Sequence, residues 1–203
     1  MSSTYSSSLR IELIGTGDQV GTWGQTTNQN LGTLLEDAVA GYTSVSITSA
    51  NQALTALNGA SDQSRNMSIA LTTTTSAAFN VYAPPSPKTY IIYNAAAHAA
   101  TIYNSTVIGN TTAAGTGVAI PAGKTMTVWS DGTNFSVQNS HVIGTVVGNV
   151  TGNVTGNVAG QLDGTITSGT TGVTQAFGTN NTTLSNTAFV QAALQALHPI
   201  GSI

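Results

Sequence analysis

A strand followed by a glycine-rich loop is predicted at the start of the chain. Leu9, Ile11 and Leu13 alternate with charged residues, and this pattern of period two is typical of a strand with one buried face. The next ten residues, GTGDQVGTWG, contain four glycines and therefore predict a loop. We expect Trp23 in this loop either to anchor the core of the segment or to contact a partner protein.

A helix is predicted after this loop. Its apolar residues recur at i, i+3, i+4, i+7 and i+8, the spacing that places side chains on one helix face. These residues are Leu31, Leu34, Leu35, Ala38 and Val39. Thr27 or Asn28 supplies a capping side chain at its start, and Gly41 supplies its C-terminal stop. Residues 1–41 are therefore predicted to form a strand–loop–helix segment.

From residue 42 to residue 142 the pattern changes to short runs of period two. The runs are rich in β-branched and aromatic residues, and turn sequences separate them about every ten residues. They span residues 45–48, 67–73, 89–93, 100–103, 117–120, 126–129 and 134–137. Pro84, Pro85 and Pro87 mark one break, and Asp131-Gly132 predicts a tight hairpin turn. A mainly β domain, a β-sandwich or jelly roll, is therefore predicted.

A strict four-residue repeat occupies residues 143–166. Glycine stands at every fourth position from Gly144 to Gly164, and branched apolar residues lie midway between the glycines. In an extended chain both sets share one face, while Asn and Thr side chains occupy the other. The residues predicted to pack along the first face include Val146, Gly148, Val150, Gly152, Val154, Gly156, Val158 and Leu162.

One copy of this repeat cannot bury its own apolar face. About 25 residues at ~3.3 Å each would extend for roughly 80 Å, whereas ordinary strands have about 3 to 10 residues. Three parallel copies about a threefold axis would pack the valines inward, and the glycines would leave room for neighbouring backbones. The repeat therefore predicts an extended trimeric β-stalk.

Residues 167–203 predict a linker and a short helix. A stretch rich in Gly, Thr and Asn extends to residue 184, and His198-Pro199 ends the helix. A helix of about three turns is marginal alone, so its apolar residues are expected to pack on another chain or on a distal part. These residues are Phe189, Val190, Leu194 and Leu197.

Charged residues make up only 5% of the chain, against about 25% in ordinary soluble domains. Four basic residues and a net charge of -3 argue against nucleic-acid binding through phosphates. No apolar run reaches the ~18 residues of a membrane span, and the first 15 residues lack the apolar run of a signal peptide. We expect a protein that is made in a cytoplasm, without membrane insertion.

The chain offers little chemistry for catalysis, metal binding or a cofactor. It has no cysteine, and His98, His141 and His198 lie far apart in sequence. Glu36 and Asp37 are adjacent carboxylates, but adjacent helix positions do not face each other. We therefore expect no enzymatic activity and no cofactor. A narrower hypothesis is that His141, just before the stalk, meets its symmetry copies around a metal or an anion.

Aromatic residues of the β region allow two interpretations. They are Tyr90, Tyr93, Tyr103, Trp129 and Phe135. Alternation along the strands favours packing in a core, whereas a glycan-binding module would expose them on one sheet face to stack on sugars. Burial of these side chains therefore distinguishes a structural protein from a carbohydrate-binding module.

Several segments resemble those of bacteriophage tail fibres. The segment SSSLRIELIGTGDQVGTWGQTTNQNLGTLLEDAVAG resembles the opening of tail-fibre-like proteins from phages of marine bacteria. RNMSIALT, KTYIIYN and GVAIPAGKTMTVWSDGTNF resemble their next β-domain. GNVTGNVTGNVAG and NTAFVQAAL are similar to fibre shafts, and PIGSI resembles the start of a tail-collar domain.

This resemblance implies an elongated homotrimer in a virion, assembled in the host cytoplasm. Its N-terminal segment would join the phage tail or an adaptor protein, and a distal fibre part would meet the bacterial surface receptor. The residues expected in the attachment are Arg10, Glu12, Asp18, Trp23, Leu34 and Leu35. The alternatives are a glycan-binding β-sandwich module and a head fibre or capsid decoration protein.

Overall fold

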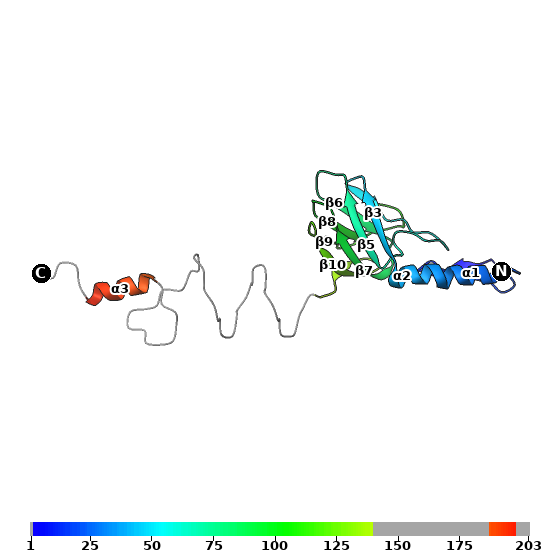
Figure 1. Ribbon diagram of the computed structural model, residues 1–203, viewed down its shortest axis with the longest axis horizontal. Coiled ribbons are helices and arrows are strands. Elements are labelled where there is room, and N and C mark those ends of the chain that lie inside the picture. Colours follow the sequence, from blue (N-terminus) through cyan, green and yellow to red (C-terminus); the bar gives the residue numbers. More distant parts are fainter. Residues whose placement is uncertain (1, 140–186, 198–203) are drawn as a thin grey trace. The chain divides into compact units, whose positions relative to one another are not determined.

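The computed structural model describes residues 2–139 and 187–197 of the chain. The chain divides into two compact units, Met1–Thr145 and Val146–Ile203. The first unit is mainly β and begins with a helical segment (Figure 1). The second contains helix α3, Thr187–Leu197, which agrees with the helix predicted there. The predicted stalk residues and His141 lie outside the described residues.

The N-terminal segment pairs two very short strands and then forms one continuous helical stretch. Strand β1, Thr4–Tyr5, is antiparallel to β2, Glu12–Leu13. The helical stretch consists of α1, Trp23–Gln29, the π-helical η1, Asn30–Leu35, and α2, Glu36–Ala40. The strand predicted over residues 9–13 is thus limited to its last two residues.

The helix begins at Trp23, earlier than the predicted cap at Thr27 or Asn28. The Trp23 amide donates to the Gln19 carbonyl at 3.0 Å, so a backbone turn starts the helix without a side-chain cap at Thr22. Trp23 is therefore a helical residue and does not lie in the predicted loop. The predicted end at Gly41 is confirmed, since α2 ends at Ala40. Glycine fits this position because a Cβ there would lie 2.4 Å from the Asp37 carbonyl oxygen.

Nine further strands form two sheets. The five-stranded sheet has the order β11-β10-β7-β5-β3, and the four-stranded sheet has the order β4-β6-β8-β9. The strands are β3 (Tyr42–Ile47), β4 (Asn51–Ala53), β5 (Ser68–Thr73), β6 (Phe79–Ala83), β7 (Pro87–Asn94), β8 (Ala100–Asn104), β9 (Val118–Ile120), β10 (Thr125–Asp131) and β11 (Phe135–Val137). All seven predicted runs are strands, while β4 and β6 were not predicted.

From β3 to β8 successive strands lie alternately in the five-stranded and the four-stranded sheet. Consequently β3, β5 and β7 are parallel neighbours, and so are β4, β6 and β8. Antiparallel strands then complete the sheets, with β9 on β8, β10 on β7 and β11 on β10. These parallel pairs differ from the antiparallel strands of a jelly roll.

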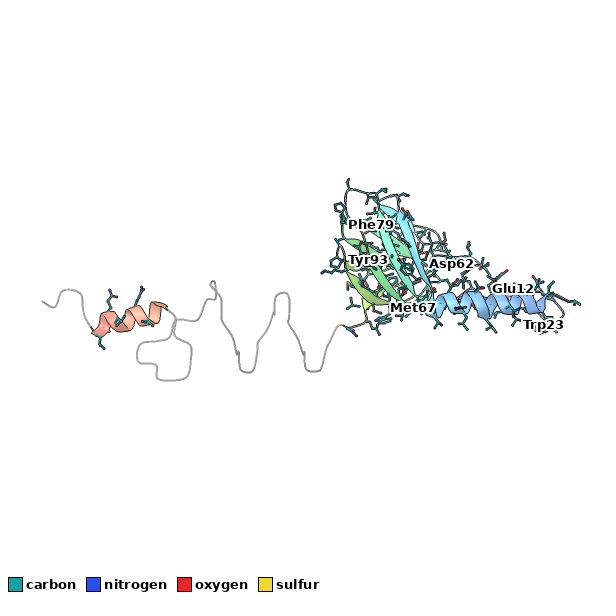
Figure 2. The ribbon with its side chains drawn as sticks, in the orientation of Figure 1. Glu12, Trp23, Asp62, Met67, Phe79 and Tyr93 are labelled. Atoms are coloured by element: carbon teal, nitrogen blue, oxygen red, sulfur yellow. The ribbon has the colours of Figure 1, made fainter. Side chains whose placement is uncertain are left out.

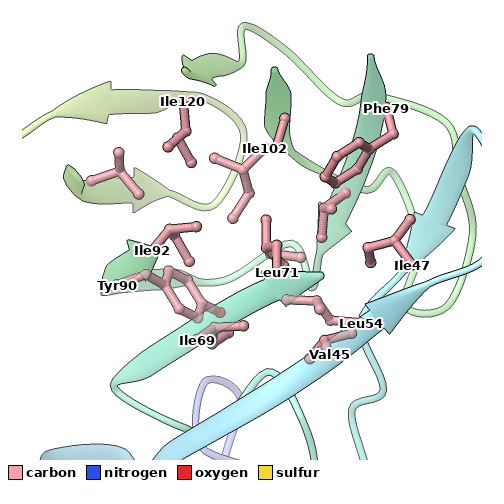
Figure 3. Packing of buried hydrophobic residues seen from close by; sticks show 14 of the residues in the cluster. Val45, Ile47, Leu54, Ile69, Leu71, Phe79, Tyr90, Ile92, Ile102 and Ile120 are labelled. Carbon is pink, nitrogen blue, oxygen red and sulfur yellow. The ribbon is translucent and has the colours of Figure 1, made fainter. Parts of the chain in front are cut away.

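One hydrophobic core lies between the two sheets (Figure 3). Each sheet contributes the inward residues of its alternating strands, as the period-two pattern requires. The five-stranded sheet contributes Val45, Ile47, Ile69, Leu71, Tyr90, Ile92, Val128 and Phe135. The four-stranded sheet contributes Phe79, Val81, Ala83, Ala100, Ile102 and Ile120.

Candidate interaction surfaces

One side of the helical stretch contacts strand β2, and another side is exposed to solvent. On the covered side, the Asn30 amide group donates to the Glu12 carbonyl at 2.8 Å and accepts from the Glu12 amide at 3.1 Å. Leu34 is fully buried, whereas Leu31 is 58% exposed and Val39 is 69% exposed. Leu35 is exposed as well. The N-terminal segment therefore leaves an apolar helix face uncovered.

The residues predicted for attachment are divided between exposed and buried positions. Trp23 and Leu35 are exposed and remain available to a partner, whereas Leu34 is buried and cannot contact one. Figure 2 shows Trp23 and Glu12 on the helical end of the unit, away from the sheets. The structure brings Glu12 into hydrogen-bonding contact with the Gln19 amide group.

The other two predicted attachment residues have internal contacts. Asp18 accepts a hydrogen bond from the Ser3 hydroxyl at 3.4 Å. Arg10 has a left-handed backbone, with φ of 53°, and its carbonyl accepts from the Gly59 amide at 2.9 Å. Arg10 therefore helps to hold the N-terminal segment against the loop before β5.

A buried arginine, which the sequence pattern does not predict as a functional residue, also joins the N-terminal segment to the sheets. The Arg65 guanidinium donates to the Leu9 carbonyl, to the Leu57 carbonyl at 2.9 Å and to the Ala60 carbonyl at 3.0 Å. It also pairs with the Asp62 carboxylate at 3.0 Å, where both side chains are almost completely buried. The Arg65 side chain thus binds both the N-terminal segment, at Leu9, and the loop between β4 and β5, at Leu57 and Ala60.

Lys88 fastens the same loop to β7. Its ammonium donates to the Ser64 carbonyl at 2.7 Å, to the Asn66 carbonyl at 2.9 Å and to the Arg65 carbonyl. It also lies 4.4 Å from the centre of the Tyr90 ring, within the range of a cation–π interaction. Burial lowers the pKa of Lys88 to about 7, although the nearby Asp62 carboxylate opposes this effect.

The sequence contains an indication of these contacts of Arg65, Asp62 and Lys88. Charged residues are so rare in this chain that each one in the β region is a candidate for a structural role. Asp62 and Arg65 also stand three residues apart, close enough to pair within one turn of the loop. Their burial, however, depends on contacts with residues distant in sequence, which the local pattern does not indicate.

The aromatic residues of the β region separate onto different faces. Tyr90 and Phe135 are 1% and 3% exposed and lie in the core, as the structural interpretation predicts. Trp129 and Tyr93 are 42% and 43% exposed, as the glycan-binding interpretation predicts. Tyr103 belongs to the other sheet and stacks on Tyr82, with ring centres 5.6 Å apart.

Trp129 and Tyr93 share the face of the five-stranded sheet that points away from the core, here called the outer sheet face. Both alternate with buried residues of their strands. Trp129 pairs across the strands with Thr89, and Tyr93 pairs with Thr125. The exposed Tyr42 of β3 alternates in the same way and lies on the same face. The outer sheet face thus combines separate aromatic rings with hydroxyl side chains.

Helix α3 of the second unit also exposes apolar side chains. Val190, Leu194 and Leu197 are all exposed, and their spacing of i, i+4 and i+7 places them on one helix face. Phe189 lies in the same helix. These residues agree with the prediction that this helix needs a partner, although the partner itself remains a prediction.

The described residues contain no group of three or more His, Cys, Asp or Glu side chains that could hold a metal ion. Within the same residues, no helix is both long enough and apolar enough to cross a membrane. The structure thus defines a mainly β protein with a helical N-terminal segment and exposed apolar faces. No family model matches the chain, and no match was found among curated proteins or solved structures.

Proposed function

We propose that this chain is a structural virion protein, a tail-proximal segment of a homotrimeric bacteriophage tail fibre. The observation that carries the proposal is the uncovered apolar helix face in each of the two units, at Leu31, Leu35 and Val39 and again along α3. Isolated exposed apolar residues are ordinary on protein surfaces, but apolar faces of whole helices mark contacts with partners. A chain that needs partners in both units is suited to assembly.

In this proposal the function is mechanical and involves no enzymatic reaction and no cofactor. The N-terminal segment attaches to the tail or to an adaptor protein, and the exposed Trp23 and Val20 are available for that contact. The sandwich-like β-domain, residues 42–142, is followed by the trimeric β-stalk, residues 143–166. The stalk leads to a distal part that meets the bacterial receptor. Three copies on one axis would turn weak receptor contacts into a stronger combined attachment.

The mass of the purified full-length chain in solution tests this proposal. We expect a particle of three chains, measured by light scattering together with its shape by small-angle scattering. The exposed helix faces and the Gly/Val repeat both require neighbouring copies, so assembly should not need an added partner. A full-length chain that stays monomeric at micromolar concentration would contradict the proposal.

A second candidate function is binding of neutral glycans, and the exposure of Trp129 and Tyr93 favours it. Aromatic rings stack on the apolar faces of sugars, and neighbouring Thr hydroxyls can bond to sugar hydroxyls. Trp129→Ala should then weaken binding to an immobilised neutral polysaccharide about fivefold, the loss of roughly 1 kcal/mol of stacking. Trp23→Ala, another exposed tryptophan away from the sheets, is the matched control and should bind normally. Equal binding by both variants would exclude the outer sheet face.

A further inference from the structure

Three of the four Lys and Arg residues of the chain line one small cavity. They are Arg10, Arg65 and Lys88, whereas the fourth, Lys124, is exposed and does not line it. The cavity lies where the N-terminal segment meets the loop between β4 and β5 and the start of β7. The chain as a whole has a net charge of -3, so its composition does not predict such a group of cations. The cavity is therefore a candidate site for a negatively charged ligand.

The charges around this cavity do not cancel. Among its lining residues Asp62 is the one carboxylate, and it pairs with Arg65 at 3.0 Å. Arg10 makes no ion pair with any residue that the structure describes. Because both guanidinium groups stay charged, the lining has an excess of positive charge even when Lys88 is neutral. Charge that is removed from water without a counter-charge is costly, and a bound anion would supply that counter-charge.

Both arginines also have a hydrogen-bond donor without a partner. The Nε atoms of Arg10 and Arg65 are buried, and neither donates to an acceptor within the described part of the chain. Arg65 is only 3% exposed, and its terminal nitrogens already donate to three backbone carbonyls and to Asp62. The Lys88 ammonium likewise donates to three carbonyls, so it contributes charge but no further N–H group. The two Nε–H groups therefore need an acceptor, since buried donors are normally paired.

The size of the cavity restricts the ligand. Its volume is about 10 Å³, close to that of a single water-sized sphere. Phosphate, sulfate and organic carboxylates have several heavy atoms and are too large for this space, whereas a single halide ion is close to it in size. Water is small enough but brings no negative charge. Chloride combines a suitable size with the charge that the lining requires.

We propose that this cavity binds one chloride ion, which accepts hydrogen bonds from the Nε–H groups of Arg10 and Arg65 beside the Lys88 ammonium. The ion joins the N-terminal segment, through Arg10, to the loop between β4 and β5, through Arg65. It thereby strengthens the junction that Arg65 already forms with the Leu9 carbonyl. This inference concerns the folded single chain and does not depend on the proposed assembly.

Urea unfolding of the full-length chain, monitored by circular dichroism at a series of chloride concentrations, tests this site. Gluconate, a larger anion, replaces chloride so that the ionic strength stays constant. A ligand that binds only the folded chain lowers the unfolding equilibrium constant, and between about 5 and 200 mM chloride we expect this constant to fall about fivefold. Equal stability in chloride and in gluconate would overturn the proposal.

Two variants locate the effect of chloride. Arg10→Gln removes one of the two donors and one positive charge, so the fall in the unfolding constant should shrink to less than about twofold. Lys124→Gln is the matched control, because it removes the same charge at an exposed position away from the cavity and should keep the full response. The same response in both variants would indicate a general effect of salt and would exclude this cavity.

Bromide allows a direct measurement on the natural chain, which does not depend on the folding of a variant. It is a slightly larger halide with a strong anomalous X-ray signal. A crystal grown in bromide should show an anomalous peak in the cavity between Arg10 and Arg65, and such a peak supports the proposal. Peaks confined to the protein surface would be adventitious ions only and would overturn it.

Discussion

Lys88 is a half-buried charged side chain, and it shows what removing a charge from water costs. Desolvation favours the neutral amine, whereas the three carbonyls around the nitrogen favour the ammonium form. Desolvation is the larger effect, because the pKa of Lys88 falls from 10.5 to about 7. The same cation also holds the loop that binds the N-terminal segment through Arg65. The protonation of one side chain is therefore coupled to the stability of the first unit.

We predict that the free energy of unfolding of the first unit increases from pH 7 to about pH 10. In this range the unfolded chain keeps a proton on Lys88 that the folded chain has released, so the slope is positive and at most about 1.4 kcal/mol per pH unit. Burial raises the pKa of Tyr90 well above its ordinary value, so stability falls again above pH 10. Urea unfolding at a series of pH values measures both changes.

Lys88→Met is the control for this prediction, because it keeps a long side chain without the titrating amine. The increase between pH 7 and pH 10 should disappear in this variant. If the variant retained the slope, another group would be responsible for it.

Among the elements, the turn after β7 depends on one fully buried amide. The Asn94 side chain donates to the carbonyls of His98 at 2.8 Å and Ile120 at 2.9 Å, and it accepts from the Ala96 amide at 3.1 Å. It thereby joins the connection between β7 and β8 to the end of β9. β7 and β8 belong to different sheets, so this connection crosses from one sheet to the other.

Asn94→Ala should lower the free energy of unfolding by about 2 to 4 kcal/mol. The substitution removes the hydrogen bonds of two buried backbone groups and one half-buried backbone group, and each buried group left without a partner costs about 1 to 3 kcal/mol. Urea denaturation monitored by circular dichroism measures the change. Asn80→Ala is the control, because its amide donates only to the exposed Asn51 side chain, at 2.9 Å. A similar loss in both variants would contradict the role given to Asn94.

At the level of the complete chain, each of the two units has an exposed apolar helix face. The first unit exposes the helix face around Leu35, and the second exposes the apolar face of α3. Between the described parts lies the Gly/Val repeat, whose role follows from its sequence pattern alone. A change in the repeat should therefore affect assembly without unfolding the sheets.

Replacing Val150, Val154 and Val158 with Asp should reduce the trimer to smaller species, because three charges per chain would be buried along the stalk. Analytical ultracentrifugation measures the mass, and circular dichroism checks that the sheets of the first unit remain folded. Replacement of Asn149, Asn153 and Asn157 with Asp is the matched control, since these positions are expected on the polar face of the repeat. Unchanged assembly of the valine variant would contradict a packed valine face.

Local pattern was sufficient to predict the helix before Gly41, α3 and seven of the strands. Each of these elements repeats its apolar residues with the period of its own backbone, and that period does not depend on distant contacts. β4 was missed because Asn51–Ala53 is short and polar, and β6 was missed beside the Thr-rich stretch before Phe79. The prolines around Pro87 predict a break, but Pro87 is the first residue of β7, where a strand tolerates proline.

The pairing of strands and the choice of buried face required long-range contacts. Period two separates Tyr90 from Tyr93 and Val128 from Trp129, but it does not say which set faces the other sheet. Parallel neighbours such as β3 and β5 pair residues from different turns of the chain, so their register is absent from local spacing. Repetition along the chain therefore determined the elements, whereas the core between the two sheets determined which aromatic side chains remain exposed.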